Sequence, residues 1–193
     1  MSDRPPVVTY LLLAINVVMF GICVLASGDG GFTNELLLKY GAVVNTTLAQ
    51  HDYWRLVAAA FLHGNFVHIL TNMYCLFAWA PVLEKYIGPL AFLGVYLLSA
   101  IGGNITSILM HPQTYLSVGA SGALSGLIGA LLALTLLGSL QLSSQFFVST
   151  LALNGVIMAT NPRIDWQAHL GGFVTGMVVC AALEVARGAS RRQ

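Results

Sequence analysis

Charged residues are scarce in this chain. Of its 193 residues, 8% are Asp, Glu, Lys or Arg and 57% are hydrophobic, whereas a soluble domain carries about 25% charged residues. This shortage excludes an ordinary soluble globular domain. The net charge of +1, without a long basic or acidic run, gives no indication of nucleic-acid binding. The composition therefore predicts a polytopic membrane protein.

Cysteine is also rare, and the common cofactor motifs are missing. Cys23, Cys75 and Cys180 are odd in number, lie inside apolar stretches and lack CxxC spacing, which favours packing over a disulfide or metal role. The patterns HExxH, GxxxxGK[ST] and GxGxxG are absent, and His63 and His68 have no nearby carboxylate to complete a usual zinc site. The sequence thus predicts no metal and no nucleotide cofactor.

Long apolar segments follow one another along the whole chain. A helix needs roughly 20 apolar residues to cross the hydrocarbon, so this length holds about six spans with short connections. We therefore predict an all-α, six-helix membrane bundle that forms a single domain over residues 1–193. The first span is too long for a signal peptide and is expected to stay attached. The predicted spans are approximately 7–27, 66–83, 90–110, 121–137, 146–160 and 166–186.

Six spans place both termini on one side of the membrane, and the basic residues indicate the cytoplasmic side. The longest polar connection, residues 28–55, is expected to fold back onto the outer membrane surface. Glu84, Lys85 and Glu184 then lie at cytoplasmic helix ends, where solvated anchors are expected. The basic residues on the predicted inside are Arg4, Lys85, Arg187, Arg191 and Arg192, against Lys39, Arg55 and Arg163 outside.

Two polar residues share one face of the second predicted span. His68 and Asn72 are four residues apart, so they project from the same side of a helix. Polar groups at bilayer depth are costly against lipid and are expected to face the bundle interior or a wet cavity. A simple helix-to-helix hydrogen bond is the alternative for either residue alone.

Ser121 stands between small residues at the start of the fourth span. Gly122 and Gly126 have the GxxxG spacing that lets membrane helices approach closely, so packing explains part of the pattern. A serine at a helix start also lies near unpaired backbone N–H groups, which favour developing negative charge. The GxSxG elbow of soluble hydrolases is not matched, because Ala123 replaces its last glycine and no strand is predicted before it.

His169 opens the sixth span in a similar setting. Gly172 and Gly176 again have GxxxG spacing, so this span presents a glycine face directly below the imidazole. Close contact between spans four and six would bring Ser121 and His169 within hydrogen-bond reach. A lone histidine is more often structural, but this pairing suggests a nucleophile and its base.

Together these residues resemble the rhomboid intramembrane serine proteases, and the resemblance covers nearly the whole chain. Several separate motifs match in order, including the segment from His63 to Asn72. The resemblance implies that Ser121 is the nucleophile and His169 its base, without a completing aspartate. It further implies that His68 and Asn72 help bind the oxyanion with the Ser121 backbone N–H. The residues matched in a structural role are Trp54, Arg55, His63, Glu84, Gly119, Gly122, Gly172 and Gly176.

The resemblance is to the compact six-span bacterial form, which implies a protein of the bacterial inner membrane, surrounded by lipids. Its expected substrates are single-span membrane proteins. No cofactor, metal or nucleic-acid partner is implied. Two positions depart from the pattern. Ser125 stands where many relatives have an aromatic ring packed on the histidine, and Ala80 replaces a glycine spaced around Glu84. Two other functions are weighed. A non-cleaving rhomboid-like protein typically lacks the serine or histidine, and a proton-coupled transporter would more usually show intramembrane acidic residues and internal symmetry.

Overall fold

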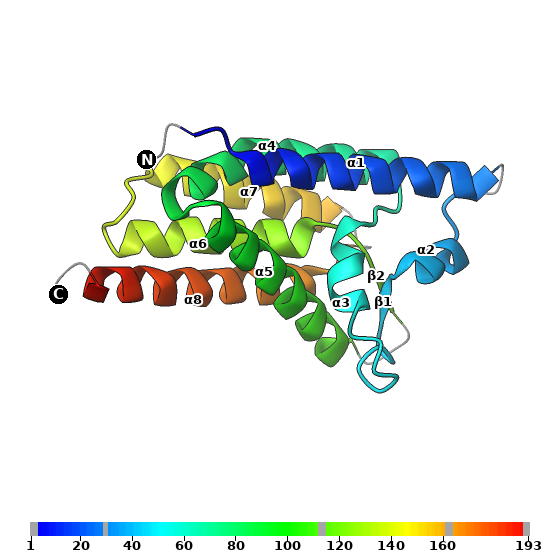
Figure 1. Cartoon of the computed structure of the whole chain (residues 1–193). Coiled ribbons are helices and arrows are strands. Elements are labelled where there is room, and N and C mark those ends of the chain that lie inside the picture. The colour runs from blue at the N-terminus through cyan, green and yellow to red at the C-terminus, as the bar shows by residue number, and fades with distance from the viewer. Residues whose placement is uncertain (1–3, 29–30, 112–114, 161–163, 191–193) are drawn as a thin grey trace.

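The computed structural model describes residues 4–28, 31–111, 115–160 and 164–190, and most of them are helical. The first helix begins and the last helix ends at the same end of the bundle, while the short elements gather at the other end (Figure 1). The long helices are α1 (Val7–Ser27), α4 (Phe66–Ile87), α5 (Pro89–Met110), α6 (Ser121–Leu136), α7 (Ser144–Thr160) and α8 (Trp166–Ser190). The short elements are α2 (Asn34–Tyr40), β1 (Val43–Val44), α3 (Arg55–Ala58), η2 (Ala59–Phe61) and β2 (Leu116–Ser117).

The six long helices coincide with the six predicted spans, and an all-α polytopic membrane fold is confirmed. The ends differ most at α4 and α8, which continue to Ile87 and Ser190 beyond the predicted ends at 83 and 186. Among the described residues, four helices are long and apolar enough to cross a membrane, namely α1, α4, α5 and α8. The helices α6 and α7 are shorter, with 16 and 17 residues, so the count of six spans stays a prediction.

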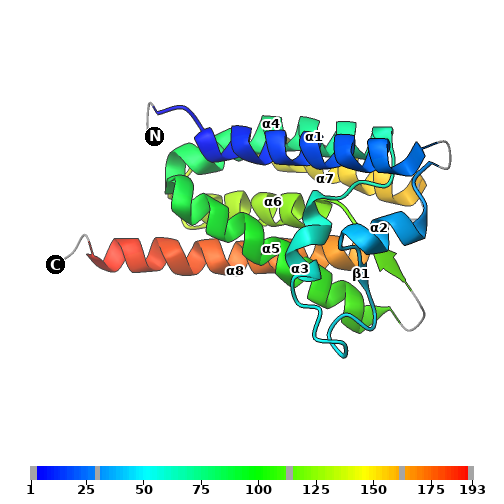
Figure 2. The same ribbon diagram turned by 45° about the vertical axis from the view of Figure 1, so that its right-hand side comes forward.

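Helix α6 forms the centre of the bundle. Both views place it between α8 on one side and the α1, α4 and α7 helices on the other, and α5 crosses α6 and α8 obliquely (Figures 1 and 2). Twelve of its sixteen residues are buried, whereas only four of the 21 residues of α1 are. Leu127 and Leu131 of α6 pack with Phe92 and Tyr96 of α5 in the main apolar cluster. Helix α6 is therefore enclosed by its neighbours over most of its length.

Glu84 is a buried structural residue, so its prediction as a solvated anchor is wrong. Its side chain is 4% exposed. One carboxylate oxygen accepts a hydrogen bond from the Val8 N–H (2.9 Å), and the other accepts from the N–H and the hydroxyl of Thr9 (both 2.7 Å). The first N–H groups of a helix have no partner within the helix, and a carboxylate there also stabilises the helix dipole. Glu84 therefore fastens the start of α1 to α4.

The connection between α1 and α4 contains more structure than the sequence predicts. β1 pairs antiparallel with β2, with Val43 opposite Ser117 and Val44 opposite Leu116. The expectation that no strand precedes Ser121 is therefore wrong, because β2 ends four residues before it. Two-residue strands are too short to produce a periodic sequence signal, which explains the omission.

Trp54 and Arg55 organise this connection. The Arg55 guanidinium donates to the carbonyls of Leu38 (2.6 Å) and Ala42 (3.2 Å) and pairs with Asp52 (2.9 Å). The Trp54 ring lies against Gly41, where a Cβ would come within 2.5 Å of the ring. These contacts support the structural role that the resemblance implies for the pair. The predicted charge distribution also counts three arginines that lie outside the described residues, namely Arg163, Arg191 and Arg192.

Replacement of Glu84 by Ala should destabilise the protein, because it leaves three donors at the start of α1 without their acceptor. We expect the free energy of unfolding in detergent to fall by about 3 kcal/mol. Glu184→Ala is a matched control, since Glu184 accepts one part-buried hydrogen bond, from the Tyr86 hydroxyl (3.0 Å). That variant should lose less than about 1 kcal/mol. Equal losses in the two variants would contradict the structural role of Glu84.

Candidate active site

The backbones of α6 and α8 touch directly through their glycines. A Cβ added to Gly172 would overlap the carbonyl oxygen of Gly122, and a Cβ added to Gly176 would overlap that of Gly126. Small residues permit such an approach between membrane helices, where van der Waals contact replaces the hydrophobic effect as the main attraction. Both predicted GxxxG pairs thus face each other, one turn apart.

Ser121 and His169 lie at the end of this contact where α6 and α8 begin. Ser121 is the first residue of α6, and His169 is the fourth residue of α8. Their chain neighbours meet, since a Cβ on Gly122 would lie 3.3 Å from the carbonyl oxygen of Ala168. Both Ser121 and His169 are half-buried. The helix packing therefore brings the hydroxyl-bearing and imidazole-bearing residues to the same place.

Helix α4 adds His68 and Asn72 from the other side. A Cβ on Gly119, two residues before Ser121, would lie 2.6 Å from His68 Nε2 and 3.5 Å from Asn72 Nδ2. Gly119 also has a φ of 124°, which L side chains rarely adopt, so both conformation and space require glycine. Its N–H donates to the carbonyl of Ala59 (2.9 Å), which fixes the loop. Among the described residues, the buried Asn72 amide nitrogen has no hydrogen-bond partner.

His63 supports His68 from the segment that precedes α4. Its ring is 1% exposed and meets the His68 ring edge-on, with centroids 5.0 Å apart. Burial, and secondarily the neighbouring His68, lowers the pKa of His63 to about 3. His63 is therefore neutral at physiological pH and adds no positive charge to the site.

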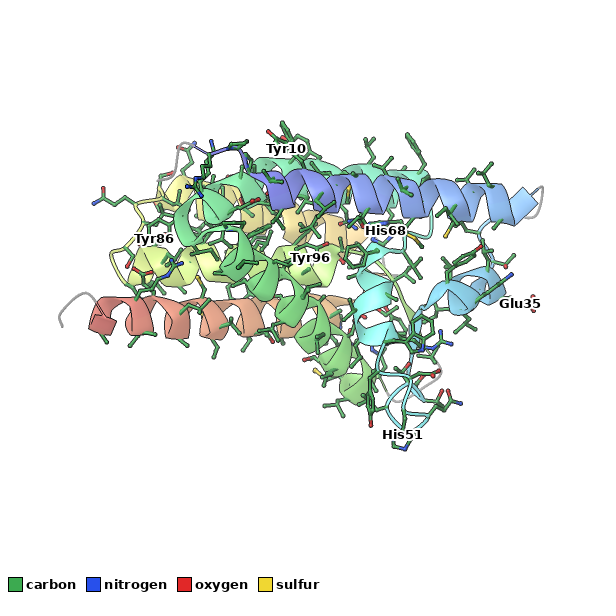
Figure 3. The ribbon with its side chains drawn as sticks, in the orientation of Figure 1. Tyr10, Glu35, His51, His68, Tyr86 and Tyr96 are labelled. Atoms are coloured by element: carbon green, nitrogen blue, oxygen red, sulfur yellow. The ribbon has the colours of Figure 1, made fainter. Side chains whose placement is uncertain are left out.

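The polar cluster lies toward the end of the bundle that carries the short elements. Figure 3 shows His68 on this side, whereas Tyr86 lies near the end where the first helix begins and the last helix ends. The structure brings Gly119, His68, Asn72 and the neighbours of Ser121 and His169 together, while Glu84, Trp54 and Arg55 act elsewhere. A hydroxyl, an imidazole and side-chain N–H donors around one point suit nucleophilic catalysis with oxyanion stabilisation.

Sequence reasoning missed Asp165. This residue directly precedes α8, and its side chain accepts a hydrogen bond from the Ala168 N–H (2.9 Å), so it caps the helix that carries His169. The sequence did contain a signal for it, because Asp is a favoured N-cap residue of helices. Asp165 lies three residues before Ala168 and four before His169. No group of three or more His, Cys, Asp or Glu side chains that could hold a metal ion occurs in the part of the chain that the structure describes.

The family model and the similar proteins all identify the same family. The model of the Rhomboid domain matches residues 50–184. Rhomboid protease GluP of Bacillus subtilis (strain 168) is 32% identical over 191 residues, which cover 94% of this chain and 36% of GluP. The Putative rhomboid protease YdcA of the same organism is 33% identical, with 90% of this chain and 86% of YdcA covered. RHOMBOID-like protein 5 of Arabidopsis thaliana is 34% identical, with 72% and 47% covered. The chain thus spans nearly all of YdcA, about half of the plant protein and about a third of GluP.

The glycine contact between α6 and α8 predicts a steric effect at Gly172. Gly172→Ala should lower the free energy of unfolding by about 2 kcal/mol, because the added methyl group meets the Gly122 backbone, which cannot move aside freely. Any reaction that needs Ser121 and His169 together should slow as well.

Gly94→Ala in α5 is the matched control, since nothing lies within 4 Å of its added Cβ. It should be neutral or stabilising by up to about 1 kcal/mol. Thermal melting of both variants in the same detergent checks this comparison. A Gly172→Ala protein as stable as Gly94→Ala would contradict the close contact.

Proposed function

Since this chain belongs to the rhomboid family, we propose that it is an intramembrane serine endopeptidase that cleaves the transmembrane segments of membrane proteins with Ser121 and His169. Membership of the family supports protease chemistry at the membrane in general. The assignment of the two residues rests on their position at the contact of α6 and α8. That contact, in which Gly172 and Gly122 touch through their backbones, is the observation that carries the proposal.

The proposed reaction proceeds through an acyl-enzyme. The Ser121 hydroxyl oxygen attacks the scissile carbonyl carbon while His169 takes its proton. The resulting oxyanion accepts hydrogen bonds from Asn72, His68 and the Ser121 backbone N–H. His169 then gives the proton to the leaving amine as the peptide C–N bond breaks. Water, deprotonated by His169, hydrolyses the ester and releases the second product, which regenerates the Ser121 hydroxyl.

The Asn72 amide supports this oxyanion assignment. Its nitrogen is buried and lacks a hydrogen-bond partner among the described residues, and it faces Gly119 beside Ser121. A buried donor without a partner costs free energy, so such groups commonly have a functional reason. An oxyanion that forms at Ser121 would supply the missing acceptor.

The length of α6 supports a site below the membrane surface. Sixteen residues extend about 24 Å, which is less than the roughly 30 Å thickness of the hydrocarbon core. If Leu136 reaches one surface, Ser121 lies inside the other. Hydrolysis at that depth requires a polar path for water from the outer side. A substrate helix must also unwind locally to expose its carbonyls, so segments with helix-breaking residues should be preferred.

We further propose single-span membrane proteins as substrates, together with a six-span arrangement in a bacterial inner membrane with both termini in the cytoplasm. The start of α1 and the end of α8 lie at one end of the bundle, which suits this orientation (Figure 1). Lys85 and Arg187 occupy the last turns of α4 and the final part of α8 at that end, in agreement with the positive-inside rule.

Replacement of Ser121 by Ala should abolish cleavage without loss of stability, because only the attacking oxygen is removed. The measurement is cleavage of a panel of single-span substrates by purified protein, with products identified by mass spectrometry. A fluorophosphonate should label Ser121. Ser149→Ala, an exposed serine on α7, is the control and should remain active. Activity that persists in Ser121→Ala, with labelling at Ser125, would disprove the assignment.

Replacement of Asn72 by Ala tests the oxyanion site separately. Loss of one oxyanion donor typically lowers turnover by on the order of a hundredfold to a thousandfold. The melting temperature should change little, since the amide nitrogen has no hydrogen bond to lose among the described residues. Rates per folded molecule and melting curves are measured on the same preparation. An unchanged rate together with a large fall in melting temperature would instead indicate a structural residue.

A further inference from the structure

One carboxylate connects three separate elements near the proposed catalytic pair. Asp165 Oδ2 accepts hydrogen bonds from the hydroxyl of Ser107 in α5 (2.5 Å) and from the hydroxyl of Ser117 in β2 (2.8 Å). Its Oδ1 accepts from the Ala168 N–H at the start of α8 (2.9 Å). Ser107 and Ser117 are both buried, with 1% and 5% of their surface exposed. Asp165 thus joins α5, β2 and α8 at one point.

Two residues of this hydrogen-bond network lie close in sequence to the proposed catalytic residues. Ser117 lies four residues before Ser121, and Asp165 lies four residues before His169. The His169 N–H donates to the Asp165 backbone carbonyl (3.3 Å), so the capping residue and the imidazole-bearing residue share the first turn of α8. The Ser117–Asp165 hydrogen bond therefore joins the segment that leads to the nucleophile with the segment that leads to the base.

Neighbouring groups hold this carboxylate in place. Ser117 is paired with Val43 in the short sheet, which restrains β2 from the opposite side. The Tyr115 hydroxyl interacts with Asp165, and burial, followed by this carboxylate, raises the pKa of Tyr115. The His111 ring stacks on Tyr115 with centroids 3.7 Å apart. Asp165 is therefore enclosed by hydroxyl and amide donors and has little freedom to move.

We infer that Asp165 is a positioning residue of the proposed protease, which sets the distance between Ser121 and His169 through its hydrogen bonds to Ser117 and Ala168. This inference rests on the proposed function for its catalytic consequence. It differs from a catalytic triad, because the Asp165 carboxylate accepts its hydrogen bonds from backbone and serine donors, and none joins it to the His169 ring among the described residues. A displacement of about 1 Å between reacting groups can lower a rate by roughly a hundredfold.

The kinetic test compares Asp165→Ala, Ser117→Ala and the double variant. Asp165→Ala should lower kcat by about tenfold to a hundredfold with little change in KM, because the groups that bind substrate stay in place. Both single variants break the same hydrogen bond, so the double variant should be no slower than Asp165→Ala. Asp165→Asn, which keeps an acceptor for Ala168, should recover part of the rate. Ser107→Ala, which leaves the Ser117 bond intact, should lose less than Ser117→Ala.

A second measurement does not depend on cleavage. With Cys23, Cys75 and Cys180 replaced by Ala, the variants Gly122→Cys and Ala168→Cys are combined in one chain. The added Cβ of residue 122 would lie 3.9 Å from the Cβ of Ala168, a separation that suits a disulfide. Oxidation with copper phenanthroline should form this disulfide quickly, and Asp165→Ala should slow its formation severalfold below the melting temperature.

The outcomes separate the two proposals. A wild-type chain that neither cleaves nor labels at Ser121 would disprove the proposed function, while the disulfide rate would still test whether Asp165 sets the helix spacing. A fall in melting temperature, with both kcat and the disulfide rate unchanged in Asp165→Ala, would show a helix cap only and overturn this inference. Additive losses in the double variant would overturn the link through Ser117.

Discussion

The direct backbone contact between α6 and α8 is the constraint on which the rest of the structure depends. Gly122, Gly126 and Gly129 lie on the face of α6 that meets α8. A Cβ added to Gly129 would overlap α8, and a Cβ added to Gly126 would overlap α5 and crowd α8. A membrane interior offers little hydrophobic force to hold helices together, so dense van der Waals contact must supply the attraction. Glycine makes that contact possible by removing the side chains.

This contact also fixes where polar groups can be placed. Ser121 and His169 come from helix starts, where unpaired backbone N–H groups already make the surroundings polar. His68 and Asn72 reach the same point from α4 because Gly119 leaves room for them. Polar side chains are thus gathered at one place inside an otherwise apolar bundle, and the surrounding helices hold them there. Such preorganisation is the main source of electrostatic catalysis.

Carboxylates and a guanidinium at the ends of helices complete the frame. Glu84 binds the first N–H groups of α1, Asp165 binds the start of α8, and Arg55 binds two carbonyls in the connection between α1 and α4. Glu84 and Asp165 satisfy N–H groups at helix starts that have no partner within the helix, and Arg55 adds hydrogen bonds to two loop carbonyls. These three charged side chains therefore lie at positions where backbone groups need partners.

The sequence by itself determined the membrane class and the order of the helices, and it predicted the residues proposed for the chemistry. Apolar run length identifies a span, and GxxxG spacing at Gly122 and Gly172 identifies helix faces, because both signals lie within one segment. Only the tertiary structure decided that Glu84 is buried against α1, that β1 pairs with β2, and that Asp165 joins Ser107 to Ser117. Each of these features connects residues that are distant along the chain. Such partners leave no periodic pattern in a single sequence, so only the packing of the helices reveals them.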